Sequence, residues 1–452
     1  MLLKNGRVVR KEGVKKLDVR IKGEEITELA DNLDPASDEK VMDLEGKLVF
    51  PGLIGSHTHF QLDARGAVAI DDFFHGSISA AYGGITSFID YADQGLNSVL
   101  AGLRERQAQA ESQTVLDYNL HLVINNDFEP EKHLSEIYEL PEAGVSSLKI
   151  FTTYENIYML SEDKLASLFQ AAAETGLVIT VHSEDNDLVT ERESRHVAEG
   201  KTGINYHPDI RPALAEKKAI EKMAELSRRY GAKLYIVHLS SRLGLEAAAE
   251  ARKDGTEIYI ETAPHYLMLT REKLNGPQGE LNFMTPPLRE KEDNQALWKG
   301  LADGLIDVVA TDHCAFTPQQ KSLGSDSLDK LPGIPGVETM LPLLYTYGVK
   351  EGRFDLNRLI ELLAVNPAQI FGLYPRKGSI KEGTDADLVV YDPEQEWVLS
   401  GDQLHSLSGY TPFSGIEVKG KIVHNIVRGE TVIKDGQFTG DKGYGRFIRA
   451  KK

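Results

Sequence analysis

Four histidines and one aspartate stand at or near the ends of apolar stretches, where their side chains could share a metal ion. They are His57 and His59 in SHTHF, His182 in VITVHSED, His238 in YIVHLSS and Asp312 in VVATDH. Imidazole nitrogens and carboxylate oxygens are donors that zinc and similar divalent ions accept. Each histidine alone would more often be a solvated or core residue, but core packing does not favour five such residues in this pattern. The set predicts a metal centre.

Lys149 in SSLKIF is the unusual member of this group. On a strand its side chain would face the same side as Ser147 and Phe151, while Leu148 and Ile150 would face the opposite side. An ammonium has only donors and cannot bind a cation. Carboxylation by carbon dioxide would give a carbamate whose two oxygens could bridge two ions about 3.5–4 Å apart. A lysine that extends its charge to solvent, or that binds a substrate anion, is the alternative; beside four histidines we favour carboxylation.

Alternating strand-like and helical stretches must position these residues. Eight apolar runs follow one another through the middle of the chain, with amphipathic stretches between them, as in βα units around a parallel sheet. The stretches 162–176 and 213–231 are typical helices that end in a glycine. Eight strands predict a (β/α)8 barrel of the TIM type, with functional side chains at the C-terminal strand ends. A doubly wound open sheet is the alternative, although no GxGxxG follows the first run. The runs are 50–57, 85–91, 118–125, 146–151, 177–182, 233–239, 257–263 and 307–313.

Both ends of the chain depart from this pattern. Residues 1–50 and the segment beyond residue 375 read as short strands, which Asn-Gly and Lys-Gly turns join in the N-terminal part. A chain of 452 residues also exceeds what one compact core usually supports. We therefore expect residues 51–374 to form the barrel, and residues 1–50 and 375–452 to build one small β-sandwich beside it.

Composition and charge narrow the class of protein. The formal net charge of −18 disfavours nucleic acid and anionic membranes as partners, because their phosphates would be repelled, and a small-molecule substrate is expected instead. Cys314 is the only cysteine, which excludes a disulfide within the chain and a cysteine-based zinc site. The first residues lack a signal-peptide pattern, and no run of eighteen apolar residues occurs, so we expect a cytoplasmic protein.

In the order HxH, lysine, two later histidines and aspartate, the chain resembles the amidohydrolase superfamily, and within it the dihydropyrimidinase and D-hydantoinase branch. The resemblance extends over nearly the whole chain and includes GLIGSHTHF, AAYGGITSFIDY, KIFTTY, VHSED, TPPLR, ATDHCAF and GSIKEGTDADLVVYDP. It implies a homo-oligomer, a tetramer in most members, and two divalent ions, of zinc or else manganese or cobalt. The implied ligands are His57, His59 and Asp312 for one ion, His182 and His238 for the other, and carboxylated Lys149 as the bridge.

The same resemblance implies hydrolysis of the ring amide of a hydantoin or dihydropyrimidine to an N-carbamoyl amino acid. Asp312 would take a proton from the attacking water and deliver it to the leaving nitrogen. Tyr154, five residues after Lys149, would support the developing oxyanion. Thr285 in TPPLR and Gly333 would hold the amide and carbonyl groups of the substrate.

Several positions depart from the branch. Members usually carry aspartate where Gly55 stands, so support for His57 would be absent or come from elsewhere. The segment KLPGIPGVE is one residue shorter and lacks the Asn that normally precedes its first glycine. The loop expected to set specificity carries Leu62, Ala64 and Arg65. An inward Arg65 would favour substrates whose ring substituent ends in a carboxylate; otherwise it would be a surface arginine paired with a nearby aspartate.

Three other functions stay open within this resemblance. Allantoinases share a segment like PHYL around His265, and are the first alternative. Dihydroorotases typically carry arginine two residues after HxH, where this chain has Gln61, which makes that activity less favoured. Non-catalytic scaffold proteins related to dihydropyrimidinase have lost metal ligands, whereas this chain keeps all six.

Four residues near these motifs are not expected to be ligands. His313 and Cys314 follow Asp312, and His313 would point away from it and support the barrel wall. His121 lies in mid-strand, where a hydrogen-bonded core histidine is expected. His265 lies beyond the seventh run, and a supporting or structural role is expected for it.

Overall fold

Eight parallel strands in the middle of the chain form one curved sheet, in which neighbours in sequence are neighbours in space. The computed structural model describes residues 1–95 and 98–451. The segments that follow the first and last strand meet, because Thr58 pairs with His313 and the His59 amide donates to the His313 carbonyl at 2.8 Å. The (β/α)8 barrel is thus confirmed. Its strands are β6 (Leu53–Gly55), β9 (Ile85–Asp93), β10 (Asp117–Val123), β11 (Ser147–Phe151), β12 (Val178–His182), β13 (Lys233–Ile236), β14 (Ile258–Thr262) and β15 (Val308–Val309).

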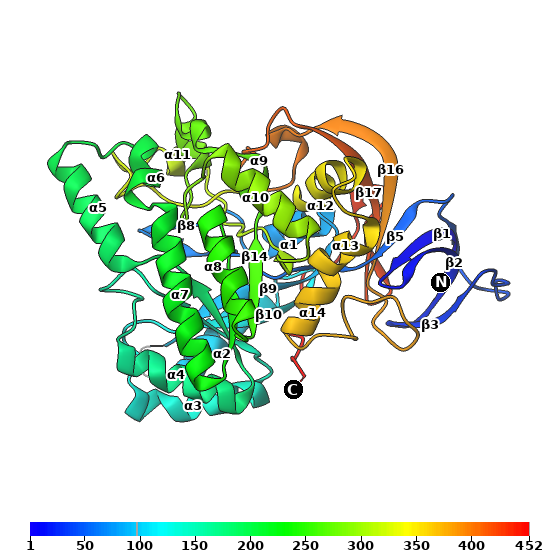
Figure 1. Ribbon diagram of the computed structural model, residues 1–452. Coiled ribbons are helices and arrows are strands. Elements are labelled where there is room, and N and C mark those ends of the chain that lie inside the picture. The colour runs from blue at the N-terminus through cyan, green and yellow to red at the C-terminus, as the bar shows by residue number, and fades with distance from the viewer. Residues whose placement is uncertain (96–97, 452) are drawn as a thin grey trace.

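The helices of the middle segment surround this sheet (Figure 1). Both predicted helices are present as α4 (Glu162–Thr175) and α7 (Ala213–Tyr230). Each ends at a glycine, Gly176 with φ 77° and Gly231 with φ 75°, because the left-handed C-cap conformation disfavours other residues. The remaining helices are α1 (Phe73–Tyr82), α2 (Val99–Glu111), α3 (Pro130–Ala143), α5 (Asn186–Ala198), α6 (His207–Ile210), α8 (Arg242–Lys253), α9 (Pro264–Met268), α10 (Lys291–Ala302), α11 (Pro318–Lys321), α12 (Met340–Leu344), α13 (Leu356–Ile360) and α14 (Asn366–Ile370).

The two ends of the chain come together in a second sheet beside the barrel (Figure 1). It is one mixed sheet of nine strands, and β5 from the N-terminal part pairs antiparallel with β16 from the C-terminal part. Some of its apolar side chains, such as Leu3, Val8 and Leu388, form a core cluster of their own, whereas others, such as Phe50 and Val389, belong to the large cluster that includes the barrel core. The helix α13 contacts β1 and β2. The strands are β1 (Leu2–Arg10), β2 (Gly13–Lys22), β3 (Glu25–Ala30), β4 (Val41–Asp43), β5 (Leu48–Pro51), β16 (Leu388–Val398), β17 (Glu417–Val427), β18 (Glu430–Lys434) and β19 (Gln437–Phe438).

The last residues of the chain leave this sheet and pack on the barrel. The Tyr118 amide donates to the Arg446 carbonyl at 2.9 Å, and the Ile448 amide donates to the Tyr118 carbonyl at 2.7 Å. Farther along, the Ala450 amide donates to Gly144, which caps α3. The tail therefore adds a short parallel pairing to the beginning of β10.

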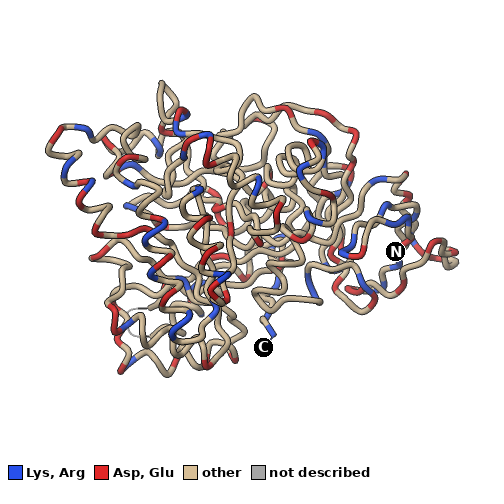
Figure 2. Tube along the Cα trace, viewed as in Figure 1, with Lys and Arg blue, Asp and Glu red and all other residues tan. Residues whose placement is uncertain are grey.

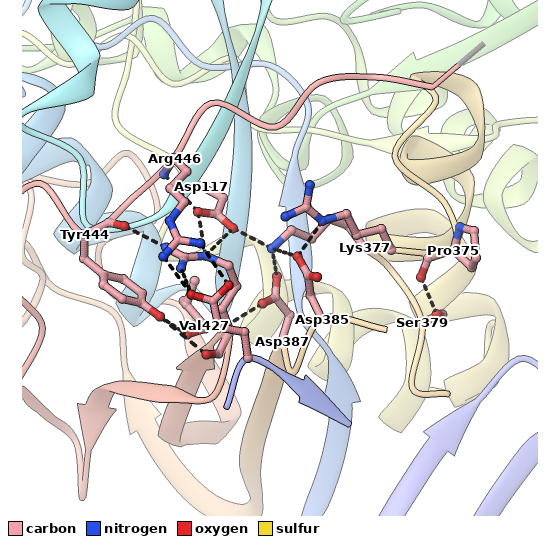
Figure 3. A network of polar contacts seen from close by, with 12 residues as sticks. Asp117, Pro375, Lys377, Ser379, Asp385, Asp387, Val427, Tyr444 and Arg446 are labelled. Carbon is pink, nitrogen blue, oxygen red and sulfur yellow. Dashed lines mark hydrogen bonds and ion pairs between the residues drawn. The ribbon is translucent and has the colours of Figure 1, made fainter. Parts of the chain in front are cut away.

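A buried ionic network joins the barrel to the second sheet (Figure 3). The Lys377 ammonium lies 2.6 Å from Asp117 at the start of β10, and 2.8 Å from Asp387 just before β16. Arg428, directly after β17, donates through Nε to the same Asp117, and through Nη1 to Glu24 at 2.9 Å. Lys377 and Arg428 are each 1% exposed, so these charges interact with little solvent screening.

We predict that Lys377→Met will lower the free energy of unfolding by about 3–5 kcal/mol, because it leaves the Asp117 and Asp387 carboxylates buried with less compensating charge. The matched control is Lys419→Met, which removes an exposed ion pair with Glu396 and should cost at most about 1 kcal/mol. Urea unfolding followed by circular dichroism measures both. Equal effects of the two substitutions would contradict a supporting role for the network.

Charged residues of both signs are mixed along the described chain, as Figure 2 shows for the outer helices. Stretches of α5, α7 and α8 carry acidic and basic residues in turn, and no long basic stripe follows these helices. Within residues 1–95 and 98–451, no helix is both long enough and apolar enough to cross a membrane.

Candidate metal centre at the mouth of the barrel

His57, His59 and Asp312 meet where the segments after β6 and β15 pair. The Nε2 atoms of both histidines lie 3.1 Å from Asp312 Oδ1. His57 Nδ1 is 2.7 Å from Glu261 Oε1, to which it donates, so a neutral His57 carries its lone pair on Nε2, facing another acceptor. Burial lowers the pKa of His57, but Glu261 and Asp312 outweigh burial and raise it to about 9. This half of the site therefore attracts a positive charge, which a metal ion can supply.

His182 and His238 form a second pair of donors. His182 Nδ1 and His238 Nε2 face each other at 3.0 Å. His182 Nε2 lies 2.8 Å from Glu184 and donates to it, which leaves the Nδ1 lone pair directed at His238. Burial lowers the pKa of both imidazoles, which favours the neutral form that can bind a cation. Among the described residues His238 Nδ1 is buried without a hydrogen-bond partner. These donors fit a second ion.

Lys149 lies in β11 with its ammonium inside the barrel. It is 2% exposed, and Nζ lies 5.2 Å from the Tyr91 ring centre and 5.0 Å from the Phe151 ring centre. Burial lowers its pKa to about 8, against the opposing influence of Asp312 and Glu261. Its charge also lowers the pKa of His182 and His238. Lys149 therefore interacts electrostatically with both halves of the donor set.

Two of the ligand positions lie beyond their strands. β13 ends at Ile236 and β15 ends at Val309, whereas the sequence pattern placed His238 and Asp312 inside the corresponding runs. Both residues have a left-handed backbone, with φ 39° for His238 and φ 49° for Asp312. Such a backbone is costly for residues with a Cβ atom and cannot continue a strand, and it is enriched at functional sites.

Tyr154 and Thr285, expected to contact substrate, lie together. Tyr154 also has a left-handed backbone with φ 64°, and its ring centre lies 5.7 Å from that of His182. Burial raises the pKa of the Tyr154 hydroxyl, while the charge of Arg211 and a hydrogen bond with Thr285 oppose this effect. Thr285 Oγ1 lies 3.1 Å from His207 Nε2. The guanidinium carbon of Arg211 lies over the Tyr154 ring, 5.0 Å from the ring centre.

Gly333 occupies the second expected substrate contact. Its φ of 134° and its close approach to Cys314, whose carbonyl would lie 2.6 Å from a Cβ atom, both favour glycine. Its amide donates to the Phe283 carbonyl at 3.0 Å, two residues before Thr285. The Thr285 and Gly333 segments are therefore neighbours, as the expected roles require.

The loop expected to set specificity forms a short hairpin of β7 (Asp63–Ala64) and β8 (Ala67–Val68). Leu62 and Ala64 pack on a small cluster that includes Cys314 and Leu331. Arg65 has φ 50°, and its Nη1 donates to the carbonyls of Leu328 and Lys330, each at 2.7 Å. The guanidinium thus joins this hairpin to the 328–330 segment, and a substrate carboxylate would have to compete with those carbonyls.

The histidines not expected to be ligands lie around the site. His313 bonds Asp71 at 3.0 Å and accepts the Gly336 amide at 3.0 Å, so its predicted supporting role is confirmed. His121 bonds Ser147 at 2.6 Å and the Ser56 carbonyl at 3.0 Å, as a satisfied core histidine does. His265 is buried, and burial lowers its pKa to about 4.

The sequence pattern missed two carboxylates that orient the ligands. Glu261, 1% exposed in β14, accepts His57 Nδ1, the His238 amide at 2.9 Å and the Tyr235 hydroxyl at 2.7 Å. It supplies the support for His57 that Gly55 cannot give. Glu184, fully buried, holds His182 and is itself paired with Arg211. The sequence signal that could have found them is their position: Glu261 lies near the end of the predicted run 257–263, and Glu184 lies two residues after the run 177–182.

The chain is similar to known proteins over nearly its whole length. The model of the amidohydrolase family matches residues 48–432. A D-phenylhydantoinase of Escherichia coli is 38% identical over 100% of this chain and 98% of its own. Two solved structures cover 100% of this chain: a D-hydantoinase (dihydropyrimidinase) from a Thermus species, with TM-score 0.96, 36% identity and 99% of that chain covered, and a dihydropyrimidinase from Brevibacillus agri, with TM-score 0.97, 33% identity and 98% covered. The chain therefore belongs to the amidohydrolase family.

Proposed function

We propose that this chain is a metal-dependent cyclic amidohydrolase that opens the ring amide of a hydantoin or dihydropyrimidine to give an N-carbamoyl amino acid. The observation that carries the proposal is the pair of facing donor groups at the mouth of the barrel, His57, His59 and Asp312 on one side and His182 and His238 on the other. The full-length similarity to hydantoinases supports the choice of substrate class.

These donor groups would hold two divalent ions, of zinc or else manganese or cobalt. When bound, such ions lower the pKa of a water molecule and polarise a carbonyl group. We propose that Lys149 is carboxylated on Nζ and contributes its carbamate to both ions. Its electrostatic interaction with both halves, and its place against the Tyr91 and Phe151 rings without a carboxylate ion pair within the described residues, support this role.

The chain's own residues would then move the proton and hold the ring. Asp312 takes a proton from the attacking water and donates it to the leaving amide nitrogen. The Tyr154 hydroxyl donates to the oxygen that gains charge as the ring carbonyl is attacked. Thr285 and the Gly333 backbone bind the amide group, while Leu62, Ala64 and Arg65 border the space for a ring substituent. The tetramer and the cytoplasmic location stay predictions.

A substrate comparison tests the proposal. The protein, purified with zinc or manganese and bicarbonate, is assayed with 5-phenylhydantoin, dihydrouracil, allantoin and dihydroorotate. We expect kcat/KM for one of the first two to exceed that for the last two by at least about tenfold, which corresponds to about 1.4 kcal/mol of transition-state binding. Chelation should abolish turnover. Preference for allantoin would favour allantoinase, and a metal-loaded protein inactive on all four would favour a scaffold protein.

A further inference from the structure

A buried lysine outside the donor groups connects the two segments that carry Thr285 and Gly333. Lys321, the last residue of α11, is 1% exposed. Its Nζ donates to the carbonyls of Phe283 at 2.7 Å, Leu331 at 2.7 Å and Gly333 at 2.8 Å. An ammonium has three N–H donors, so the three carbonyls satisfy it completely. One acceptor precedes Thr285 by two residues and the other two lie in the Gly333 segment.

This environment is unusual for a lysine. A buried ammonium normally has a carboxylate partner, because desolvation of an unpaired charge is costly. In the described part of the chain Lys321 forms no ion pair; the neighbouring Lys330 pairs with Glu280 at 3.1 Å instead. Burial lowers the pKa of Lys321 to about 7, with Lys330 as a further unfavourable charge and with Cys314 and Glu280 opposing them. Main-chain carbonyls, and not a carboxylate, are therefore the hydrogen-bond partners of Lys321 Nζ.

Other contacts of α11 extend the connection to the hairpin around Arg65. Gln320 Nε2 donates to the Val68 carbonyl in β8 at 2.8 Å. Lys330 Nζ donates to the carbonyls of Lys321 and Ser322 at the end of α11, each at 3.2 Å. The short helix thus contacts all three segments that border the proposed substrate pocket, and Lys321 is its only fully buried charged side chain among the described residues.

We propose that Lys321 is a positioning residue for the substrate ring: its ammonium fixes the 283–285 and 331–333 segments relative to each other, and so sets the distance between Thr285 and Gly333. This rests on the proposed function, in which those two residues bind the ring amide. The carbonyl of Gly333 has a second lone pair, so it can accept from Lys321 and still receive a ring N–H.

The test compares Lys321→Met with Lys299→Met, which removes an exposed lysine of α10 paired with Asp303. In metal-loaded protein we measure metal content, hydrogen exchange of backbone amides, and kcat and KM for hydantoin and dihydrouracil. For Lys321→Met we expect unchanged metal content, faster exchange confined to 283–285 and 331–333, and a rise of at least tenfold in KM with a smaller change in kcat. Loss of ground-state ring binding predicts this split. Lys299→Met should change none of these.

Lys321→Gln keeps two N–H donors and should change KM and hydrogen exchange less than Lys321→Met does. This variant also provides the test if the methionine variant does not fold. Unchanged exchange in both segments together with unchanged KM would overturn the proposal. So would faster exchange spread evenly over the barrel with activity lost only in proportion to unfolded protein. If the parent protein hydrolyses none of the cyclic amides, the proposed function fails, and the exchange measurement still decides whether Lys321 holds the two segments.

Discussion

Asp312→Asn should lower kcat for the hydantoin substrate by about 10²–10⁴-fold, the range expected for removal of a general acid and base. The amide is nearly the same size as the carboxylate and keeps one oxygen, but it cannot take a proton from water and return it to the leaving nitrogen. Asp312 lies in the donor group where the reaction is proposed to occur, with its Oδ1 3.1 Å from the Nε2 atoms of both His57 and His59.

The kinetic measurement for Asp312→Asn needs elemental analysis of the same preparation, because the substitution also weakens a donor of the metal centre. The control is Asp303→Asn, an exposed position on the outer side of the barrel. A variant that retained metal and tens of per cent of the parent kcat would assign the proton transfer to another residue. Glu184 would be an unsuitable replacement, because it is already paired with Arg211 and His182.

Much of the fold can be predicted from local patterns of apolar and polar residues along the sequence. The eight apolar runs became strands because their residues are buried on both faces; all five residues of β12, for example, are buried. The glycines at 176 and 231 ended the predicted helices for a local reason, their left-handed backbone. In the same way, Lys149 could be directed into the barrel by alternation along β11 alone.

The rest of the site depends on approaches between distant segments. His238 and Asp312 have a left-handed backbone just beyond the ends of their strands, and the apolar runs of the sequence predicted both residues inside the strands instead. In the sequence, Glu261 is only one polar residue in an apolar run. Its partner His57 lies 204 residues away along the chain, so no local pattern indicates their contact. The role of Lys321 depends entirely on main-chain carbonyls, which every residue has and which therefore leave no sequence pattern.

Lys149→Ala should remove at least one of the two ions and lower kcat by at least about 10²-fold, because alanine cannot supply the two carbamate oxygens that bridge an ion pair. The fold should survive, since the substitution removes side-chain atoms from one buried position and its main structural cost is the cavity that it leaves. Lys253→Ala, on the exposed end of α8, is the matched control.

Chemical rescue makes the Lys149 prediction specific. A small carboxylic acid such as acetate or propionate can enter the space left in Lys149→Ala and present two oxygens where the carbamate would lie. We therefore expect added acetate to restore part of the metal content and activity of this variant, while the parent protein depends instead on bicarbonate during metal loading. If Lys149→Ala binds as much metal as the parent and gains nothing from acetate, Lys149 does not bridge the ions. An anion-binding lysine would then be the better assignment, because its loss would raise KM and leave the metal centre intact.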